Sequence, residues 1–187
     1  MNTELERVVR ELKDRNDIWD CLMRYSLGVD RLDRAALESV YHPDAHDDHG
    51  WIAGTAAAFI DWVLAYHGKA QHRTQHVINN FRCDLAGDVA HVETYWTYFA
   101  VNIEKPHHVI YAGRYIDRFE RRNGEWRIAD RICVLTTTGN DREDPDGLAG
   151  DMFYAPTARD TTDVAYMRPL HVDPARFTTS PQVAGNE

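Results

Sequence analysis

Four long runs between residues 71 and 138 constrain the fold of this chain more than any other feature. They cover residues 71–85, 89–104, 107–122 and 126–138, and each is rich in β-branched and aromatic residues. Turn-forming residues separate the runs, and the Asn123-Gly124 pair is a strong signal for a two-residue hairpin. The pattern predicts a meander of long antiparallel strands.

Helical periodicity dominates the part of the chain before these strands. Apolar residues recur at helical spacing twice, first as Leu5, Val8, Val9 and Leu12, and then as Ile18, Leu22, Tyr25 and Val29. Two amphipathic helices, the second capped from the polar stretch Asp14–Asp17, account for this pattern, and so does one bent helix.

Two shorter helices are predicted next. One covers Arg34–Tyr41 and is ended by Pro43, with Asp33 well placed to cap it. The other has Thr55 as its N-cap and runs through Tyr66, with Gly68 as the stop. Helices followed by a strand meander indicate an α+β domain.

The length of 187 residues, with 43% hydrophobic residues, suits one domain over residues 1–138 and a tail over 139–187. Strands such as Val92–Val101 are apolar on both faces, so we expect one face to meet the helices and the other a ligand cavity or another subunit. The tail is predicted to have no regular element beyond one helical turn. Its apolar Met152–Tyr154 and Phe177 indicate that it packs on the domain or on a neighbouring subunit.

Composition excludes several classes of protein. A net charge of -9 and a pI near 5.5 argue against nucleic acid as a partner, because no basic stripe offsets the acidic surface. The sequence shows no signal peptide and no run long and apolar enough to span a membrane, so we expect a cytoplasmic protein. Cys21, Cys83 and Cys133 are widely spaced in apolar contexts and are predicted to be reduced core thiols.

A histidine in a strand-like stretch is the first candidate for chemistry. His76 lies in the middle of Arg73–Asn80, where it is either a core residue satisfied by a hydroxyl or carbonyl group, or a base. Asp30 ends the second helical run and is its candidate partner. The alternative for Asp30 is an exposed ion pair with Arg31 or Arg34.

The chain contains an ordered set of recognisable segments: Ile18, Arg24-Tyr25, Val29–Asp33, Tyr41–Gly50, His76–Asn80, Gly87–Tyr95 and Gly113–Arg131. As a set, they closely resemble the SnoaL-like branch of the nuclear-transport-factor-2-like superfamily, and the resemblance covers residues 5–138. It implies a cone-shaped α+β barrel, in which a curved, mixed, mostly antiparallel sheet wraps around N-terminal helices and encloses a pocket. Catalytic members include scytalone dehydratase, bile acid 7α-dehydratase, hexachlorocyclohexane dehydrochlorinase and polyketide cyclases.

The resemblance also implies a set of catalytic residues. In the dehydratase and dehydrochlorinase members, an Asp at a helix end pairs with a strand His, which matches Asp30 and His76. An Arg on the last strand matches Arg131, and Tyr25 matches a Tyr of the bile acid enzyme. His76 would take a proton and Asp30 would orient it, while Tyr25 would donate a hydrogen bond to the substrate. Arg131 would stabilise developing negative charge or keep Asp30 ionised.

Other parts of the site are less constrained by the sequence. Trp51, Tyr95, Tyr111 and Tyr115 are candidates for substrate binding, because an aromatic lining suits a flat cyclic compound, although such residues are more often core. The general acid has no matched residue; His107 and His108 lie nearby in the sequence.

A histidine- and aspartate-rich stretch invites comparison with a metal site. It contains His42, His46, Asp47, Asp48 and His49, but the spacing matches no known helical ligand motif. We expect instead a polar loop at the pocket rim or at a subunit interface, followed at Trp51-Ile52 by a short strand pair or loop. No metal and no cofactor are predicted.

These features together favour a cofactor-independent lyase, dehydratase or isomerase that abstracts a proton from a hydrophobic cyclic small molecule of polyketide-, steroid- or aromatic-like type. One alternative is a non-catalytic β-type subunit of an aromatic-ring-hydroxylating dioxygenase, and another is a small-molecule binding module. A homo-oligomer is expected, with a trimer ahead of a dimer.

Overall fold

The computed structural model describes residues 3–104, 108–140 and 161–177. Three helices occur there: α1 (Thr3–Asp30), α2 (Arg34–Val40) and α3 (Ala56–Ala70). The strands are β1 (Tyr41–Asp48), β2 (Ala53–Thr55), β3 (Gln71–Ala86), β4 (Val89–Asn102), β5 (His108–Arg122) and β6 (Glu125–Asn140). Two 3-10 turns, η2 (Val164–Tyr166) and η3 (Pro174–Arg176), lie in the tail.

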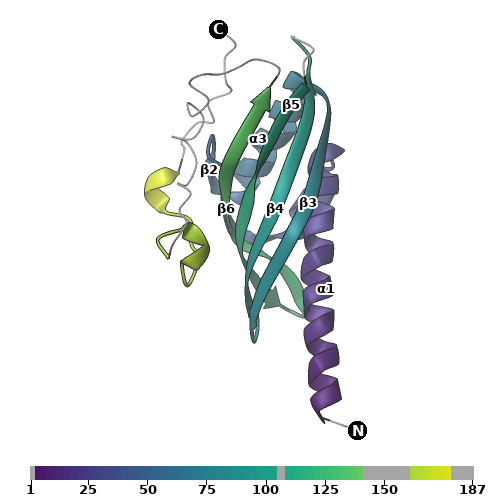
Figure 1. The fold of residues 1–187 in the computed structure, drawn as a ribbon, viewed down its shortest axis with the longest axis vertical. Coiled ribbons are helices and arrows are strands. Elements are labelled where there is room, and N and C mark those ends of the chain that lie inside the picture. The colour runs from purple at the N-terminus through teal and green to yellow at the C-terminus, as the bar shows by residue number, and fades with distance from the viewer. Residues whose placement is uncertain (1–2, 105–107, 141–160, 178–187) are drawn as a thin grey trace.

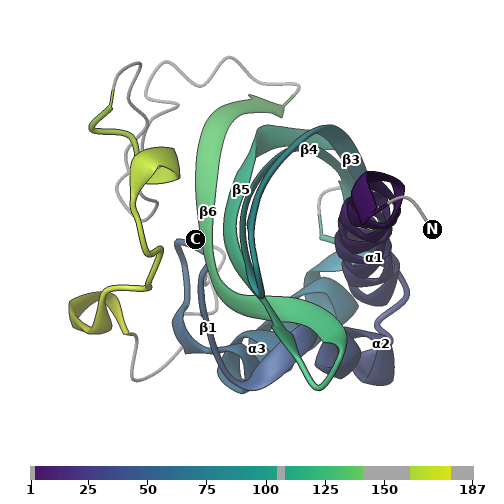
Figure 2. The same ribbon diagram turned by 90° about the horizontal axis from the view of Figure 1, so that it is seen from below.

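The strands form one mixed sheet in the order β2-β1-β6-β5-β4-β3 (Figure 1). β1 and β6 run parallel, and every other neighbouring pair is antiparallel. Seen from below, the long strands curve around the side on which the helices lie, and residues 161–177 lie on the opposite side, next to β6 (Figure 2). The predicted α+β class with a curved, mostly antiparallel sheet is confirmed.

Side chains of β4 alternate strictly between the two faces of the sheet. Those of Thr94, Trp96 and Tyr98 are buried toward the helices, on what we call the inner face. Tyr95 and Phe99 point to the outer face and remain 45% and 41% exposed. Cross-strand pairing carries this alternation to the neighbouring strands, so each inner residue of β4 faces inner residues of β3 and β5.

The N-terminal helical runs form a single helix, α1, and not two. Asp14 does not cap a second helix, because its carboxylate accepts hydrogen bonds from Trp126 Nε1 at 3.0 Å and Arg121 Nη1 at 2.8 Å. The polar residue therefore belongs to a tertiary contact and needs no break in the helix. Beyond it Ile18 and Leu22 are fully buried.

Local capping and turn signals place the other elements. Asp33 accepts from Ala36 N at 3.1 Å and begins α2, and Thr55 accepts from Ala58 N at 3.2 Å and begins α3, both as predicted. Asn123 and Gly124 both have positive φ, as the predicted tight hairpin requires. The predicted stop at Gly68 is wrong: α3 continues to Ala70, and Gly68 lies inside the helix at a cost of about 1 kcal/mol.

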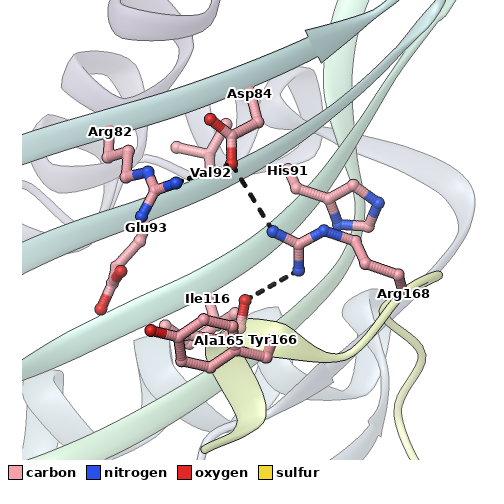
Figure 3. Close-up of a pocket in the computed structure, with 9 residues that line it drawn as sticks. All are labelled: Arg82, Asp84, His91, Val92, Glu93, Ile116, Ala165, Tyr166 and Arg168. Carbon is pink, nitrogen blue, oxygen red and sulfur yellow. Dashed lines mark hydrogen bonds and ion pairs between the residues drawn. The ribbon is translucent and has the colours of Figure 1, made fainter. Parts of the chain in front are cut away.

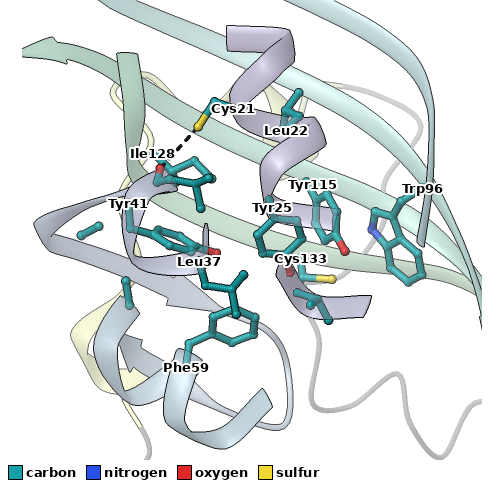
Figure 4. Packing of buried hydrophobic residues seen from close by; sticks show 14 of the residues in the cluster. Cys21, Leu22, Tyr25, Leu37, Tyr41, Phe59, Trp96, Tyr115, Ile128 and Cys133 are labelled. Atoms are coloured by element: carbon teal, nitrogen blue, oxygen red, sulfur yellow. Dashed lines mark hydrogen bonds between the residues drawn. The ribbon is translucent and has the colours of Figure 1, made fainter. Parts of the chain in front are cut away.

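Aromatic rings fill the core between α1, α3 and the inner face of the sheet. The ring of Tyr115 lies between those of Tyr25 and Trp96, with a centroid separation of 5.5 Å to each (Figure 4). All three cysteines are buried and unpaired.

A second, smaller cluster holds the described part of the tail on the outer face. Leu170 and Val172 are buried against Ile116, Ile132 and Val134 of β5 and β6. Polar contacts join the same surfaces: Arg114 pairs with Asp163, and Arg118 Nε donates to the Leu170 carbonyl at 2.9 Å.

The predicted apolar segment Met152–Tyr154 lies outside the described residues. No helix within the described ranges is long and apolar enough to cross a membrane.

Candidate functional site

Asp30 and His76 are in direct contact where the C-terminal end of α1 meets β3. His76 Nδ1 lies 2.7 Å from Asp30 Oδ1, and the His76 backbone N–H donates to Asp30 Oδ2 at 2.8 Å. Thr74, two residues earlier on the same face of β3, donates its hydroxyl to Oδ1 at 2.8 Å. Asp30 thus uses both oxygens to hold β3, and neither Arg31 nor Arg34 is among these hydrogen-bond partners.

Electrostatics keep this carboxylate charged. Burial alone would raise the pKa of Asp30, but the hydrogen bonds and electrostatic attraction from His76 and the hydrogen bond from Thr74 lower it below its ordinary value. An ionised Asp30 accepts a hydrogen bond from His76 Nδ1–H, which leaves Nε2 as the basic nitrogen of the neutral ring. The His76 side chain is only 8% exposed.

A second imidazole, which the sequence analysis missed, faces the pair. The ring of His67 on α3 lies 5.8 Å from that of His76, nearly perpendicular to it, and 5.7 Å from that of Tyr98. His67 Nδ1 contacts Gln71 Oε1, and the Tyr98 hydroxyl lies 3.4 Å from the same nitrogen. Burial lowers the pKa of His67 to about 4, so it stays neutral at physiological pH.

The sequence did contain a signal for His67. It falls on the buried side of α3, four residues after Val63 and seven after Ile60. A search for titratable residues on the apolar face of a predicted helix would therefore have identified His67.

Arg131 of β6 and Tyr25 of α1 lie together in a separate group with Asp117 and Tyr115, which we call the Arg131 cluster. Arg131 is fully buried and forms a bidentate pair with Asp117, at 2.7 and 2.8 Å. Its guanidinium carbon lies 4.2 Å from the Tyr25 ring and 4.1 Å from the Tyr115 ring. Among the described residues the ion-pair partner of Arg131 is Asp117, and Asp30 takes its bonds from His76 and Thr74.

Asp47 of β1 and His49, which directly follows this strand, form a second carboxylate–imidazole pair next to this cluster. Asp47 is fully buried, accepts from the Tyr41 hydroxyl at 2.6 Å and lies 2.8 Å from His49 Nδ1. Burial would lower the pKa of His49, but Tyr25, Cys133 and Asp47 around it raise the pKa well above its ordinary value.

The candidate substrate-binding residues are spread over several places. Tyr115 belongs to the Arg131 cluster, and Tyr111 stacks on Tyr98 with ring centroids 5.8 Å apart, so both lie on the inner face. Trp51 is half-buried in the turn between β1 and β2. Tyr95 lies on the outer face, away from Asp30 and His76.

The histidine- and aspartate-rich stretch is a strand and not a loop, which corrects the expectation for this segment. Asp47 and Asp48 are buried, and β1 pairs with β2. Trp51 and Ile52 lie in the turn between these two strands, which is the loop alternative for that dipeptide. His42 Nε2 lies 2.9 Å from the Glu120 carbonyl, and Asp48 pairs with Arg176 of the tail. No cluster suited to a metal ion occurs among the described residues. His107 and the side chain of His108 lie outside what the structure describes.

A cavity of about 70 Å³ lies on the outer face, between β3, β4, β5 and the tail (Figure 3). Three of its charged groups form ion pairs with one another: Asp84 lies 3.4 Å from Arg82 and 3.7 Å from Arg168. The cavity is small, and the sheet separates it from Asp30 and His76. The inner face is therefore the better candidate for chemistry.

Comparison with protein families shows to which family the chain belongs. The SnoaL-like domain model matches residues 10–132. The chain belongs to the SnoaL-like domain family. An uncharacterised protein of Mycobacterium tuberculosis is 29% identical to this SnoaL-like chain over 128 residues, covering 66% of it and 86% of the relative.

Solved structures share the fold of this SnoaL-like protein. The hexachlorocyclohexane dehydrochlorinase LinA-type3 from Novosphingobium barchaimii is 20% identical with a TM-score of 0.66, covering 72% of this chain and 94% of that one. A protein from Novosphingobium aromaticivorans, provisionally named an aromatic ring hydroxylase, is 22% identical with a TM-score of 0.61, covering 69% and 94%. A nuclear transport factor 2-like superfamily protein from Salmonella enterica is 16% identical with a TM-score of 0.58, covering 66% and 92%.

Proposed function

We propose that this protein is a cofactor-independent enzyme, either a lyase of dehydratase type or an isomerase, that abstracts a proton from a hydrophobic cyclic small molecule. The observation that carries the proposal is the contact between Asp30 and His76 on the inner face, at 2.7 Å. A largely buried imidazole whose Nδ1 is held by an ionised carboxylate is a suitable base at neutral pH. The similar fold of a dehydrochlorinase supports an elimination as the type of reaction.

In this mechanism His76 Nε2 takes a proton from a carbon next to a carbonyl or leaving group. Asp30 keeps the ring in the required tautomer and stabilises the imidazolium that forms. In an elimination the electron pair of the broken C–H bond becomes the new double bond, and the leaving group departs with its own pair. In an isomerisation the same proton returns at another carbon of the enolate.

The Arg131 cluster is suited to the opposite end of the substrate. Its guanidinium carries a permanent positive charge, and the Tyr25 hydroxyl can donate a hydrogen bond, so both groups can stabilise negative charge that develops on an oxygen. The ion pair with Asp117 would hold the Arg131 guanidinium in position for this role.

Proton exchange tests the role of His76 without knowledge of the natural substrate. A panel of cyclic ketones in D₂O is followed by ¹H NMR for loss of the proton next to the carbonyl group. His76→Gln should lower the exchange rate by about a hundredfold or more. His72→Gln, at an exposed position of the same strand, should leave the rate unchanged. Equal rates for wild type and a folded His76→Gln variant would overturn the proposal.

A second candidate, the non-catalytic subunit, has its own support. One structural neighbour is provisionally named an aromatic ring hydroxylase, and the apolar Tyr95, Phe99 and Ile110 are exposed on the outer face, where another subunit could pack. The expected homo-oligomer could use the same face. Light scattering of the purified chain measures its own assembly, and copurification with a large Rieske-type subunit would favour this candidate over the enzyme.

A further inference from the structure

The first turns of α1 carry an apolar stripe that stays exposed in the described structure. Leu5, Val8, Val9 and Leu12 are 58%, 37%, 56% and 61% exposed, and every residue from 3 to 10 is exposed. At about 100° per residue, these four side chains fall within roughly 100° of arc around the helix. We call this set the N-terminal stripe.

The N-terminal stripe faces away from the side of α1 that packs on the domain. Asp14, Ile18 and Tyr25 are buried on that side, and they lie about 130–170° around the helix from the middle of the stripe. Figure 1 shows the N-terminal turns of α1 running past the ends of the strands. Further along α1, the side that carries the stripe is covered, because Trp19 packs against Phe81 of β3 with ring centroids 5.3 Å apart. The stripe therefore lies beyond the part of α1 that the sheet covers.

A solvated helix has no use for this pattern. Exposed helical turns are marginally stable on their own, and ion pairs within the helix, such as those of Arg7 with Glu4 and Glu11, support them only weakly. Polar residues at the stripe positions would serve a solvated helix as well or better. Aliphatic residues at i, i+3, i+4 and i+7 are the pattern of a helix that packs on a partner.

The charges of this segment argue against a membrane surface as that partner. A helix that lies on a membrane has a polar face rich in Lys and Arg. Residues 3–13 instead carry three acidic and three basic side chains, namely Glu4, Glu6, Glu11, Arg7, Arg10 and Lys13. The chain as a whole has a net charge of -9, which anionic lipids repel. A protein surface of mixed charge fits the stripe better.

The flanks of the N-terminal stripe are complementary to those of a second copy in antiparallel orientation. Glu4 and Glu6 border its N-terminal end, one on each flank, and Arg15 and Lys13 border its C-terminal end in the same way. All four lie about 80–100° around the helix from Leu5. An antiparallel pair brings each acidic end beside the partner's basic end, whereas a parallel pair would place the acidic ends side by side.

The same orientation matches the apolar residues. In a two-fold pair centred between Val8 and Val9, Leu5 of one copy meets Leu12 of the other, and Val8 meets Val9. Residue 14 of each copy then faces residue 3 of the other, so the two domains lie at opposite ends of the pair. The stripe is therefore self-complementary in both shape and charge.

We propose that the N-terminal stripe is a self-association surface, through which two copies of this chain pair their α1 helices antiparallel across a two-fold axis. The contact covers about three turns of each helix and buries less than the roughly 1,200 Å² of a stable interface, so the dimer dissociates on dilution into the micromolar range. The inference does not rest on the proposed function, because Leu12 and Asp30 are about 27 Å apart along α1.

Sedimentation velocity of the full-length chain measures the pairing. Between about 1 and 300 µM, wild type should change from monomer to dimer. Val9→Glu should weaken dimerisation at least about tenfold, because it places two carboxylates next to the two-fold axis. Glutamate is a better helix former than valine, so α1 should be kept, and circular dichroism checks this.

Arg10→Gln is the matched control. It lowers the net charge by one unit, as Val9→Glu does, but Arg10 is exposed and lies about 140° around the helix from Leu5. It should leave the dimerisation constant within about twofold of that of wild type. The series is also measured with Phe99→Ser present, so that association through the exposed aromatic residues of the outer face is not counted.

A charge exchange tests the orientation of the helices. Glu6→Lys and Lys13→Glu should each weaken the dimer about three- to tenfold, because like charges then meet between the two copies. The double variant exchanges the two charges and should restore dimerisation to within about threefold of wild type. In a parallel pair positions 6 and 13 do not meet, so failure of the double variant to restore the dimer would overturn the antiparallel pairing.

Four other results would also overturn the proposal. The chain could stay monomeric at about 300 µM, or Val9→Glu could weaken association no more than Arg10→Gln does. A trimer as the species lost with Val9→Glu would exclude a two-fold contact. Binding of wild type, but not of Val9→Glu, to vesicles of phosphatidylcholine and phosphatidylglycerol, without a dimer in solution, would assign the stripe to a membrane surface instead.

Discussion

Asp30 holds His76 by two of its atoms at once: Oδ1 meets the ring nitrogen Nδ1 at 2.7 Å, and Oδ2 accepts the backbone N–H at 2.8 Å. One carboxylate at the end of α1 thus fixes both the position of β3 and the orientation of the imidazole. The contact therefore holds α1 against β3 and also forms the candidate catalytic pair. Substitutions of Asp30 should therefore change stability and activity by separate routes.

Asp30→Asn should lower proton exchange by about a hundredfold. The amide is neutral, so it cannot stabilise the imidazolium, and its NH₂ group can favour the tautomer with the proton on Nε2. The rate is measured by the ¹H NMR exchange assay on protein checked for native circular dichroism. A folded Asp30→Asn variant with the wild-type rate would show that the carboxylate does not orient the base.

The same variant should also lose an acid-dependent part of the stability. The folded-state pKa of Asp30 lies below its unfolded value of 3.8, so the ionised group stabilises the fold above pH 3.8, and this contribution is lost as the pH falls through the folded-state pKa. Urea unfolding at pH 6 should separate wild type from Asp30→Asn more widely than at pH 3. If the difference in stability between wild type and Asp30→Asn were the same at pH 3 and pH 6, the lowered pKa of Asp30 would be contradicted.

His67 should make stability depend on pH in the range from about 6.5 to 4. Its folded-state pKa of about 4 lies below the ordinary value of 6.5, so the unfolded chain binds the proton first and stability falls as the pH drops through this range. The full loss would be about 3 kcal/mol. His67→Gln should flatten the curve of unfolding free energy against pH.

His42 requires a control in that experiment, because burial and neighbouring arginines also lower its pKa to about 4. The protein with His67 and the His67→Gln variant are therefore compared with His42→Gln present in both. An NMR titration in which the His67 ring protonates near pH 6.5 would contradict the expected slope.

The elements with local signals could be predicted from the sequence. Thr55 and Asp33 cap helices, and Asn123-Gly124 forms a hairpin, because each signal depends on neighbouring residues only. The Asp30–His76 contact was predicted from family resemblance and from the chemistry of the two residue types. Spacing alone left open the alternative of an ion pair between Asp30 and Arg31 or Arg34.

The remaining parts of the site depend on long-range register. β4 is apolar on both faces, so its sequence could not show that Trp96 faces inward and Tyr95 outward, and a shift of one residue would exchange them. The pairing of Asp117 with Arg131 depends on the register of β5 against β6. Asp14 looked like a helix cap because its partners, Trp126 and Arg121, are more than a hundred residues away in the chain.

Arg131→Met should destabilise the protein by about 3–5 kcal/mol, because it leaves Asp117 buried without its counter-ion. The double variant Arg131→Met/Asp117→Leu should be more stable than the single one, since no uncompensated charge remains. Urea unfolding of the two variants and of wild type measures both effects. Equal stability of the single and double variants would show that Asp117 is neutral in the fold.

Gly113→Ala should be among the most disruptive single-atom additions in the sheet. A Cβ atom at this position would lie 2.1 Å from the Val134 carbonyl oxygen and 2.6 Å from Trp96 Cζ2. The backbone of β6 cannot move away without breaking its ladder with β5, so the strain falls on Trp96 as well. We expect a loss of at least about 2–3 kcal/mol in unfolding free energy, because the β6 backbone and the indole would both have to shift.

Gly139→Ala provides the matched control. It adds the same atom to a glycine of β6, but the nearest neighbour of its Cβ would be the Ile110 carbonyl oxygen at 3.8 Å, an ordinary van der Waals contact. It should be neutral or stabilise the protein by up to about 1 kcal/mol, because alanine restricts the unfolded chain. If Gly113→Ala were as stable as Gly139→Ala, Trp96 could not be packed against β5 at Gly113.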